Sequence, residues 1–123
     1  MTEDEISKVI LDCAFKVHTR LGPGLLESSY RACLAYELRK ADLFVEEEKP
    51  LPLIYDEIKL ECGYRIDLLV NSEVIVELKT VEAFNEVHQA QILTYMKLTD
   101  AKLGLLLNFY VKSLKNGIKR FIL

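Results

Sequence analysis

The chain has 123 residues, of which 28% are charged and 50% are apolar, and its formal net charge is -3 at pH 7. This length is typical of one domain with one hydrophobic core, so we expect a single domain over residues 1 to 123. The composition excludes a low-complexity or disordered chain, and the slight negative charge argues against broad, non-specific affinity for nucleic acids.

Neither a membrane span nor a disulfide framework is predicted. The sequence has no apolar run of the roughly 18 residues that crosses a bilayer, and it opens on the acidic, polar stretch MTEDEISK, where a signal peptide is basic and then apolar. We therefore expect a cytoplasmic protein. The three cysteines, Cys13, Cys33 and Cys62, are odd in number and widely spaced, which predicts small apolar residues of the core.

Two helices come first in the predicted order. Thr2 and Glu5 have the spacing of a capping box, and apolar residues follow at helical spacing, which predicts a helix over about residues 3 to 20. The sequence GPG at 22 to 24 ends it, and a second helix is predicted from about Leu25 to Ala41. The residues predicted to be buried are Ile6, Val9, Ile10, Cys13, Val17 and Leu21 in the first helix, and Leu26, Tyr30, Cys33, Leu34, Leu38 and Ala41 in the second.

The rest of the chain predicts strands around a third helix. Strands are expected near residues 44 to 48, 51 to 55, 58 to 62, 65 to 70 and 74 to 80. Helical spacing then runs through Phe84, Val87 or His88, Gln91, Ile92 and Tyr95. A buried strand at 102 to 110 and a last strand at 118 to 123 follow, the latter after the turn signal Asn116-Gly117. This order predicts an α/β (α+β) fold in which a mixed central β-sheet is flanked by helices.

The predicted hairpin at residues 65 to 79 carries charge where a core is expected. If residues 71 to 73 form a three-residue turn, paired residue numbers sum to 144, and Asp67 lies opposite Glu77 while Lys79 lies opposite Arg65. A two-residue turn would put the two acids on opposite faces. With the longer turn, one face is entirely apolar and consists of Ile66, Leu68, Val70, Val74, Val76 and Leu78.

The facing carboxylates need a compensating charge. At about 5 Å two anions repel by about 3 kcal/mol at an effective dielectric constant near 20. Bound protons, the cations Arg65 and Lys79, or a divalent metal ion would offset this repulsion. In an ordinary hairpin a salt-bridged surface patch is the more frequent outcome. The metal hypothesis is favoured here because Leu69 and Ile75 continue the charged face toward the turn, which places the charges at the border of a core.

At these residues the sequence resembles the PD-(D/E)XK nuclease superfamily. Its signature is an Asp on one strand of a hairpin and E-x-K on the next, matched here by Asp67 and by Glu77-Leu78-Lys79. Ile66 stands where the signature has Pro. The predicted element order agrees with the αβββαβ core of the superfamily, a restriction-endonuclease-like fold, preceded here by an extra helix.

Two further motifs resemble branches of this superfamily. GLLESSY at 24 to 30 is similar to the G-x-x-E-x-x-Y pattern of the GxxExxY protein family, through Gly24, Glu27 and Tyr30. Gln91 and Tyr95 resemble the Q-x-x-x-Y motif of the RecB-like branch. The matches together span Gly24 to Tyr95 and follow the order of the superfamily.

The resemblance implies a metal-dependent active site. Asp67 and Glu77 would bind Mg²⁺ or Mn²⁺, with the carbonyl of Leu78 as a further ligand and Glu27 as an outer or direct ligand. Lys79 would orient the attacking water or accept its proton. Such a metal ion would stabilise charge on a phosphodiester and lower the pKa of water.

Each of these roles has a structural alternative. Lys79 alone could be the counter-ion of Glu77 or Asp67, and Glu27 could complement the dipole of a first helical turn. Gln91 and Tyr95 would help to place nucleic acid, but Tyr95 could equally be an amphipathic core residue. His88 lies on the same helix face, and we interpret it as a surface histidine outside the site.

The resulting hypothesis is a metal-dependent phosphodiesterase, a nuclease acting on DNA. A small, slightly acidic protein offers few phosphate contacts, so affinity would be modest, or supplied by a homodimer or a protein partner. The sequence concentrates basic residues near its end, with five Lys or Arg and no acid over residues 101 to 123. The alternatives are a non-catalytic nucleic-acid or protein-binding module that retains the fold, and a hydrolase of another phosphoester.

Overall fold

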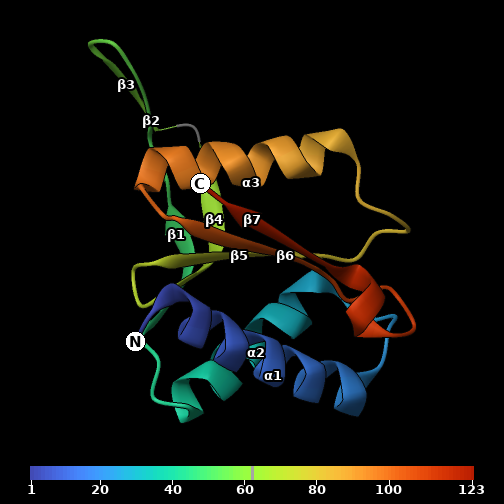
Figure 1. The fold of residues 1–123 in the computed structure, drawn as a ribbon. Helices are drawn as coiled ribbons and strands as arrows, with labels where there is room; N and C mark the ends of the chain where they lie inside the picture. The colour runs from blue at the N-terminus through green and yellow to red at the C-terminus, as the bar shows by residue number, and fades with distance from the viewer. Residues whose placement is uncertain (62) are drawn as a thin grey trace.

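The computed structural model describes residues 1 to 61 and 63 to 123 and shows a mixed sheet between helices (Figure 1). The sheet has five strands in the order β1-β4-β5-β6-β7, in which β5 and β6 are parallel and the other neighbours are antiparallel. Its strands are β1 Val45–Pro50, β4 Arg65–Val70, β5 Val74–Lys79, β6 Leu103–Asn108 and β7 Ile118–Ile122. The predicted α+β architecture is confirmed.

Helices α1 (Glu3–Leu21) and α2 (Glu27–Lys40) cover one face of this sheet (Figure 1). The predicted capping box of α1 is present, because the Thr2 hydroxyl accepts from the Glu5 N–H and the Thr2 N–H donates to the Glu5 carboxylate. Leu21, Leu26 and Ala41, which the spacing predicts to be buried, are exposed. They lie at helix ends, where the chain turns away from the sheet.

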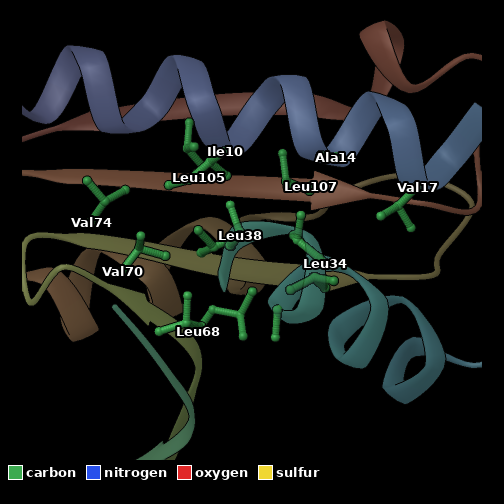
Figure 2. Close-up of a cluster of buried hydrophobic side chains, with 14 of the residues drawn as sticks. Ile10, Ala14, Val17, Leu34, Leu38, Leu68, Val70, Val74, Leu105 and Leu107 are labelled. Atoms are coloured by element: carbon green, nitrogen blue, oxygen red, sulfur yellow. The ribbon is translucent and has the colours of Figure 1, made fainter. Parts of the chain in front are cut away.

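The core beneath α1 and α2 is apolar along the sheet, and Figure 2 shows part of it. Helix residues at three- and four-residue spacing meet alternate residues of the strands, as their periodicities require. The labelled side chains are Ile10, Ala14, Val17, Leu34, Leu38, Leu68, Val70, Val74, Leu105 and Leu107. Cys13 and Cys33 are partly buried at the edge of this cluster, and Cys62 lies outside the described residues.

Helix α3 (Glu86–Thr99) covers the opposite face with a smaller core (Figure 1). Ile92, Tyr95 and Met96 of α3 pack on Ile75 and Leu106 of the sheet, among other residues. Gly104 of β6 allows this close approach, since a Cβ atom there would lie 2.7 Å from the Met96 sulfur. The third helix therefore sits where its apolar spacing predicts, with Val87 exposed and His88 half-buried.

A separate two-stranded sheet projects from the body of the molecule (Figure 1). It consists of β2 (Leu53–Tyr55) and β3 (Ile58–Leu60), which are shorter than predicted. Leu51, predicted in a strand, instead lies before β2, where its N–H donates to the Tyr64 carbonyl at 2.8 Å. The base of this hairpin is thereby tied to the end of β1 and the start of β4.

The chain after β6 passes through the short helix η1 (Leu114–Gly117) before β7. The turn signal Asn116-Gly117 lies in η1, and the last strand begins directly after it at Ile118, as the sequence predicts. Gly117 is required for space, because a Cβ atom there would lie 2.5 Å from the Asn108 carbonyl oxygen. No helix among residues 1 to 61 and 63 to 123 is long and apolar enough to cross a membrane.

Candidate active site

The hairpin of β4 and β5 carries the two carboxylates that the sequence predicts to face each other. Leu68 pairs with Val76, Leu69 with Ile75 and Val70 with Val74, which is the predicted register. Beyond these pairs the acids themselves bridge the strands. The Asp67 N–H donates to Glu77 Oε2 at 2.7 Å, and the Leu78 N–H donates to Asp67 Oδ2 at 2.8 Å. Each carboxylate is thereby held by the backbone of the opposite strand.

The regular alternation of β4 is interrupted at Asp67. Alternation predicts Ile66 on the same face as Leu68, yet Ile66 packs in the other core, with Leu69. Asp67 bonds a side chain instead of a strand carbonyl, and Glu48, which falls opposite it in the register of β1, has a positive φ of 47°. The prediction for Ile66 is therefore wrong.

The described pairing of β4 with β5 also stops at Leu68 and Val76. It does not extend to the predicted pairing of Lys79 with Arg65. Lys79 is aligned instead with Asn108 of β6. The hairpin opens at the site, and the end of β5 is held by the parallel strand on its other side.

Burial gives both carboxylates an increased affinity for protons. The exposed fraction of Glu77 is 3%, and burial, followed by the negative charge of Asp67, raises the pKa of Glu77 to about 8. Burial likewise raises the pKa of Asp67, although the Leu78 N–H and the Lys79 ammonium act in the opposite direction. A proton or a cation between the acids would relieve the repulsion.

Lys79 connects the carboxylates to helix α3. Its Nζ donates to Gln91 Oε1 at 3.4 Å, and Gln91 Nε2 donates to the Tyr95 hydroxyl at 3.2 Å. Burial, then the charges of Glu77 and Asp67, raises the pKa of Tyr95. The structure thus brings Gln91 and Tyr95, which lie one turn apart on α3, to the side of the hairpin that carries the acids.

His88 has a different role, as a cap of α3. The Asn85 N–H donates to His88 Nδ1 at 3.2 Å, and the His88 N–H donates to the Asn85 side-chain oxygen at 2.9 Å. These bonds satisfy two donors at the start of the helix. The interpretation of His88 as a satisfied surface histidine agrees with this geometry.

Glu27 approaches the hairpin from the first turn of α2. Burial raises the pKa of Glu27 and the Asp67 charge raises it further, whereas Lys79 and Arg31 lower it. These effects require Glu27 to lie within electrostatic reach of Asp67 and Lys79. Three carboxylates, from α2, β4 and β5, therefore act on one another at this end of the sheet.

Asn108 anchors the chain that leaves Lys79. It is buried at the end of β6; its Nδ2 donates to the Val81 carbonyl at 2.7 Å, and its Oδ1 accepts from the Val81 N–H at 3.2 Å. The Phe109 N–H also donates to the Lys79 carbonyl at 2.9 Å. These bonds fix the backbone around Lys79, so its side chain extends from a rigid support.

The family profile of the PD-(D/E)XK nuclease superfamily matches residues 4 to 121. The chain belongs to the PD-(D/E)XK nuclease superfamily. No curated protein and no solved structure matches the chain. Membership of this superfamily supports a function of the nuclease type, with a nucleic acid as substrate.

PD-(D/E)XK nucleases generally use divalent metal ions, and the residues present fit such an ion in part. Among the described residues, no group of three or more His, Cys, Asp or Glu side chains is arranged as a metal cluster. The buried Glu77 and the half-buried Asp67, both of raised pKa, nevertheless provide the carboxylate oxygens that Mg²⁺ and Mn²⁺ prefer. Since Mg²⁺ keeps several waters in protein sites, one or two carboxylates are a sufficient donor set.

Sequence reasoning missed several residues around this candidate site. Arg31 lies one turn after Glu27 on α2, and its charge lowers the pKa of both Glu27 and Asp67. Its Nη1 lies 3.4 Å from the Glu48 carboxylate. The i, i+4 spacing from Glu27 could have indicated Arg31, and a polar residue ending the apolar run LGLLL could have indicated Asn108.

Proposed function

We propose that this protein is a metal-dependent phosphodiesterase that cleaves DNA, with Asp67, Glu77 and Lys79 at its active site. The observation that carries the proposal is the pair of bridging carboxylates on the opened hairpin. They are held by reciprocal backbone hydrogen bonds, their pKa values are raised by burial, and Lys79 acts on both. Burying charge lowers stability, and carboxylates of strongly raised pKa cluster at functional sites.

The donors proposed for Mg²⁺ or Mn²⁺ are Asp67, Glu77 and the carbonyl of Leu78, with Glu27 as an outer or direct ligand. The Leu78 N–H points to Asp67, and in a strand the carbonyl of a residue points to the same side as its N–H. Each acid accepts a backbone N–H through one oxygen, Asp67 Oδ2 or Glu77 Oε2. A bound ion would stabilise charge on the phosphodiester and lower the pKa of water.

The remaining residues would place and activate the reactants. Lys79, whose Nζ is oriented by Gln91 Oε1, would orient the attacking water or accept its proton. Tyr95 fixes the amide of Gln91 in turn, and the two would contact the nucleic acid next to the scissile phosphate. The chain from Lys79 through Gln91 to Tyr95 thus gives the ammonium a defined direction, which proton transfer requires.

We also propose that the chain belongs to the GxxExxY branch of the superfamily. Tyr30 donates to the Gly22 carbonyl and accepts from the Leu25 N–H at 3.1 Å, which closes the connection between α1 and α2. Gly24 within it has a φ of 102°, a conformation that favours glycine. The Gly and Tyr of the motif would therefore shape the turn from which Glu27 reaches the site.

A cleavage assay tests the proposed activity. The purified protein is incubated with linear, circular and single-stranded DNA and with RNA, in Mg²⁺ or Mn²⁺ and in chelator. We expect cleavage of DNA with metal alone, and a loss of about 10²-fold or more in Asp67→Asn and Lys79→Ala. Lys97→Ala, which changes an exposed lysine of α3, is the matched control and should cleave normally.

Activity that survives in both Asp67→Asn and Lys79→Ala would contradict the proposal and indicate a contaminating nuclease. Binding of DNA by the wild type without cleavage would instead favour a non-catalytic binding module. Cleavage of RNA in preference to DNA would support the proposed active site and show that RNA is the substrate.

Calorimetry tests the metal site separately. Mn²⁺ should bind to the wild type and to Glu73→Gln, a change in the exposed turn of the same hairpin, and should fail to bind to Glu77→Gln. Because both variants exchange one glutamate for glutamine, a difference between them reports on the position of the carboxyl group. Equal binding to the two variants would place the ion elsewhere.

A further inference from the structure

The two halves of the chain differ in how their basic side chains are neutralised. In the first 61 residues, every Lys and Arg except Arg20 lies within 4.0 Å of a carboxylate. Among residues 63 to 123, only Arg120 does, through Asp4. The cations of this second part without an acid partner in the described chain are Arg65, Lys79, Lys97, Lys102, Lys112, Lys115 and Lys119. Unpaired cations are available to phosphate groups.

Two of these lysines border a hollow between α1 and the segment after β6. The hollow has a volume of about 340 Å³, and Phe15, His18, Gly22, Lys112 and Lys115 contribute to its wall. Lys112 and Lys115 are exposed, and none of the residues described in its wall is acidic. The hollow therefore has a positive rim in a protein whose net charge is negative.

Side-chain packing holds this rim in place. The buried His18 of α1 donates from Nε2 to the Val111 carbonyl at 2.8 Å, next to Lys112. On the other side of Lys115, Gly117 is packed against the Asn108 carbonyl without room for a Cβ atom. The segment that carries both lysines is thus tied to α1 and to β6.

The hollow lies at the same end of the sheet as the proposed active site. Phe109 joins the two, because its N–H bonds the Lys79 carbonyl and its ring lies 4.6 Å from that of Tyr30, centroid to centroid. The Tyr30 hydroxyl bonds Gly22 in the wall of the hollow. Figure 1 shows η1, the connection between α1 and α2 and the connection between β5 and α3 at one end of the molecule.

We propose that this hollow binds the phosphate backbone of the nucleic acid, with Lys112 and Lys115 contacting phosphates on one side of the scissile bond. The inference rests on the proposed function, since the strand held here would continue to Asp67, Glu77 and Lys79. Lysines contact phosphate as point charges and read no base. Binding at the hollow is therefore independent of sequence and sensitive to salt.

Fluorescence anisotropy with a short labelled DNA duplex, and with one strand of it, tests the inference in chelator, where no cleavage occurs. Lys112→Ala with Lys115→Ala should weaken binding on the order of tenfold at moderate salt. It should also reduce the slope of log Kd against log salt concentration by about 2, roughly one for each phosphate contact. Lys112→Arg with Lys115→Arg should bind like the wild type, because the charges are kept.

The matched control is Lys97→Ala with Lys102→Ala. These exposed lysines are also unpaired in the described chain, but Lys97 lies in the last turn of α3 and Lys102 precedes β6, so Lys102 lies at the opposite end of that strand from Asn108. The control removes the same charge and should keep nearly full affinity and salt slope. Equal weakening in the two double variants, or no binding of either DNA by the wild type, would overturn the inference.

The outcomes separate this inference from the proposed function. If DNA binding depends on Lys112 and Lys115 but the protein does not cleave, phosphate binding at the hollow is supported and the proposed nuclease activity is contradicted. If cleavage depends on Lys79 but binding does not depend on Lys112 and Lys115, the nuclease activity is supported and phosphate binding at the hollow is contradicted. Thermal unfolding should be the same for all variants, since the four lysines are exposed.

Discussion

The two faces of the central sheet differ in the side chains that they carry. The face under α1 and α2 is apolar along β5, through Val74, Val76 and Leu78. On the face under α3, Ile75 is followed on the same strand by Glu77 and Lys79. The first face supplies most of the buried apolar surface that stabilises the fold. The second gives up part of that surface to hold charges that are unfavourable when buried, and the proposed chemistry lies there.

A cavity on the apolar face should produce the largest effect on stability and none on the chemistry. Leu34 is fully buried between α2 and the sheet (Figure 2). Leu34→Ala should lower the free energy of unfolding by about 2 to 5 kcal/mol, measured by urea denaturation. Below the unfolding transition, Mn²⁺ affinity should stay unchanged. A loss of metal affinity in a folded Leu34→Ala protein would mean that the two faces are not separable.

Removing a carboxylate from the α3 face should raise the free energy of unfolding at alkaline pH, which is the opposite of the effect of Leu34→Ala. The pKa of Glu77 is about 8 in the folded protein, against about 4.3 in an unfolded chain. The folded state thus binds the proton more tightly, and the stability that this proton contributes is complete below about pH 4.3 and is lost as the pH rises through about 8. Metal-free wild-type protein should lose stability over this range, at up to about 1.4 kcal/mol per pH unit.

Glu77→Gln lacks this dependence, because an amide resembles the protonated acid and can still accept the Asp67 N–H. In chelator, the variant should match the wild type at about pH 4 and exceed its free energy of unfolding by a few kcal/mol at about pH 9. Glu73→Gln, on the exposed turn, controls for net charge and should follow the wild type. If the free energy of unfolding depends on pH in the same way in the wild type and in Glu77→Gln, then ionisation of Glu77 does not destabilise the folded state.

The register of the hairpin of β4 and β5 could be predicted from the sequence because it depends on local features. Register follows from turn length, and the three-residue turn fixes Leu69 opposite Ile75. The common helix face of Gln91 and Tyr95 could be predicted for the same reason, since residues four apart on a helix lie on one face. In each case the residue spacing within one local element carries the prediction.

The surroundings of the hairpin could not be predicted in the same way. Ile66 changes core because the side chains of Asp67 and Glu77 take over the strand hydrogen bonds. Arg31 reaches the site from another element, and Gly117 is required by a close approach to the backbone of Asn108. These features depend on which distant groups meet, which hydrophobic periodicity does not encode.

The contact between α3 and the charged face gives a smaller expected effect. Tyr95→Phe removes the hydroxyl that accepts from Gln91, and should cost about 0.5 to 1.5 kcal/mol in the free energy of unfolding. Because Gln91 also orients Lys79, we expect cleavage to fall several-fold, with Mn²⁺ affinity retained. Thr94→Ala, on the exposed side of the same helix, is the control. Unchanged cleavage in Tyr95→Phe would make Tyr95 a residue of the core alone.

His88 defines where the charged face ends, and its replacement should have the smallest effect. It shares a helix face with Gln91 but bonds Asn85, at the start of α3. His88→Ala removes half of that capping box and should lower the free energy of unfolding by about 0.5 to 1 kcal/mol. Cleavage and Mn²⁺ affinity should not change, because the ring is committed to the helix terminus. A loss of Mn²⁺ affinity in His88→Ala would extend the site by one helical turn and assign the imidazole a part in it.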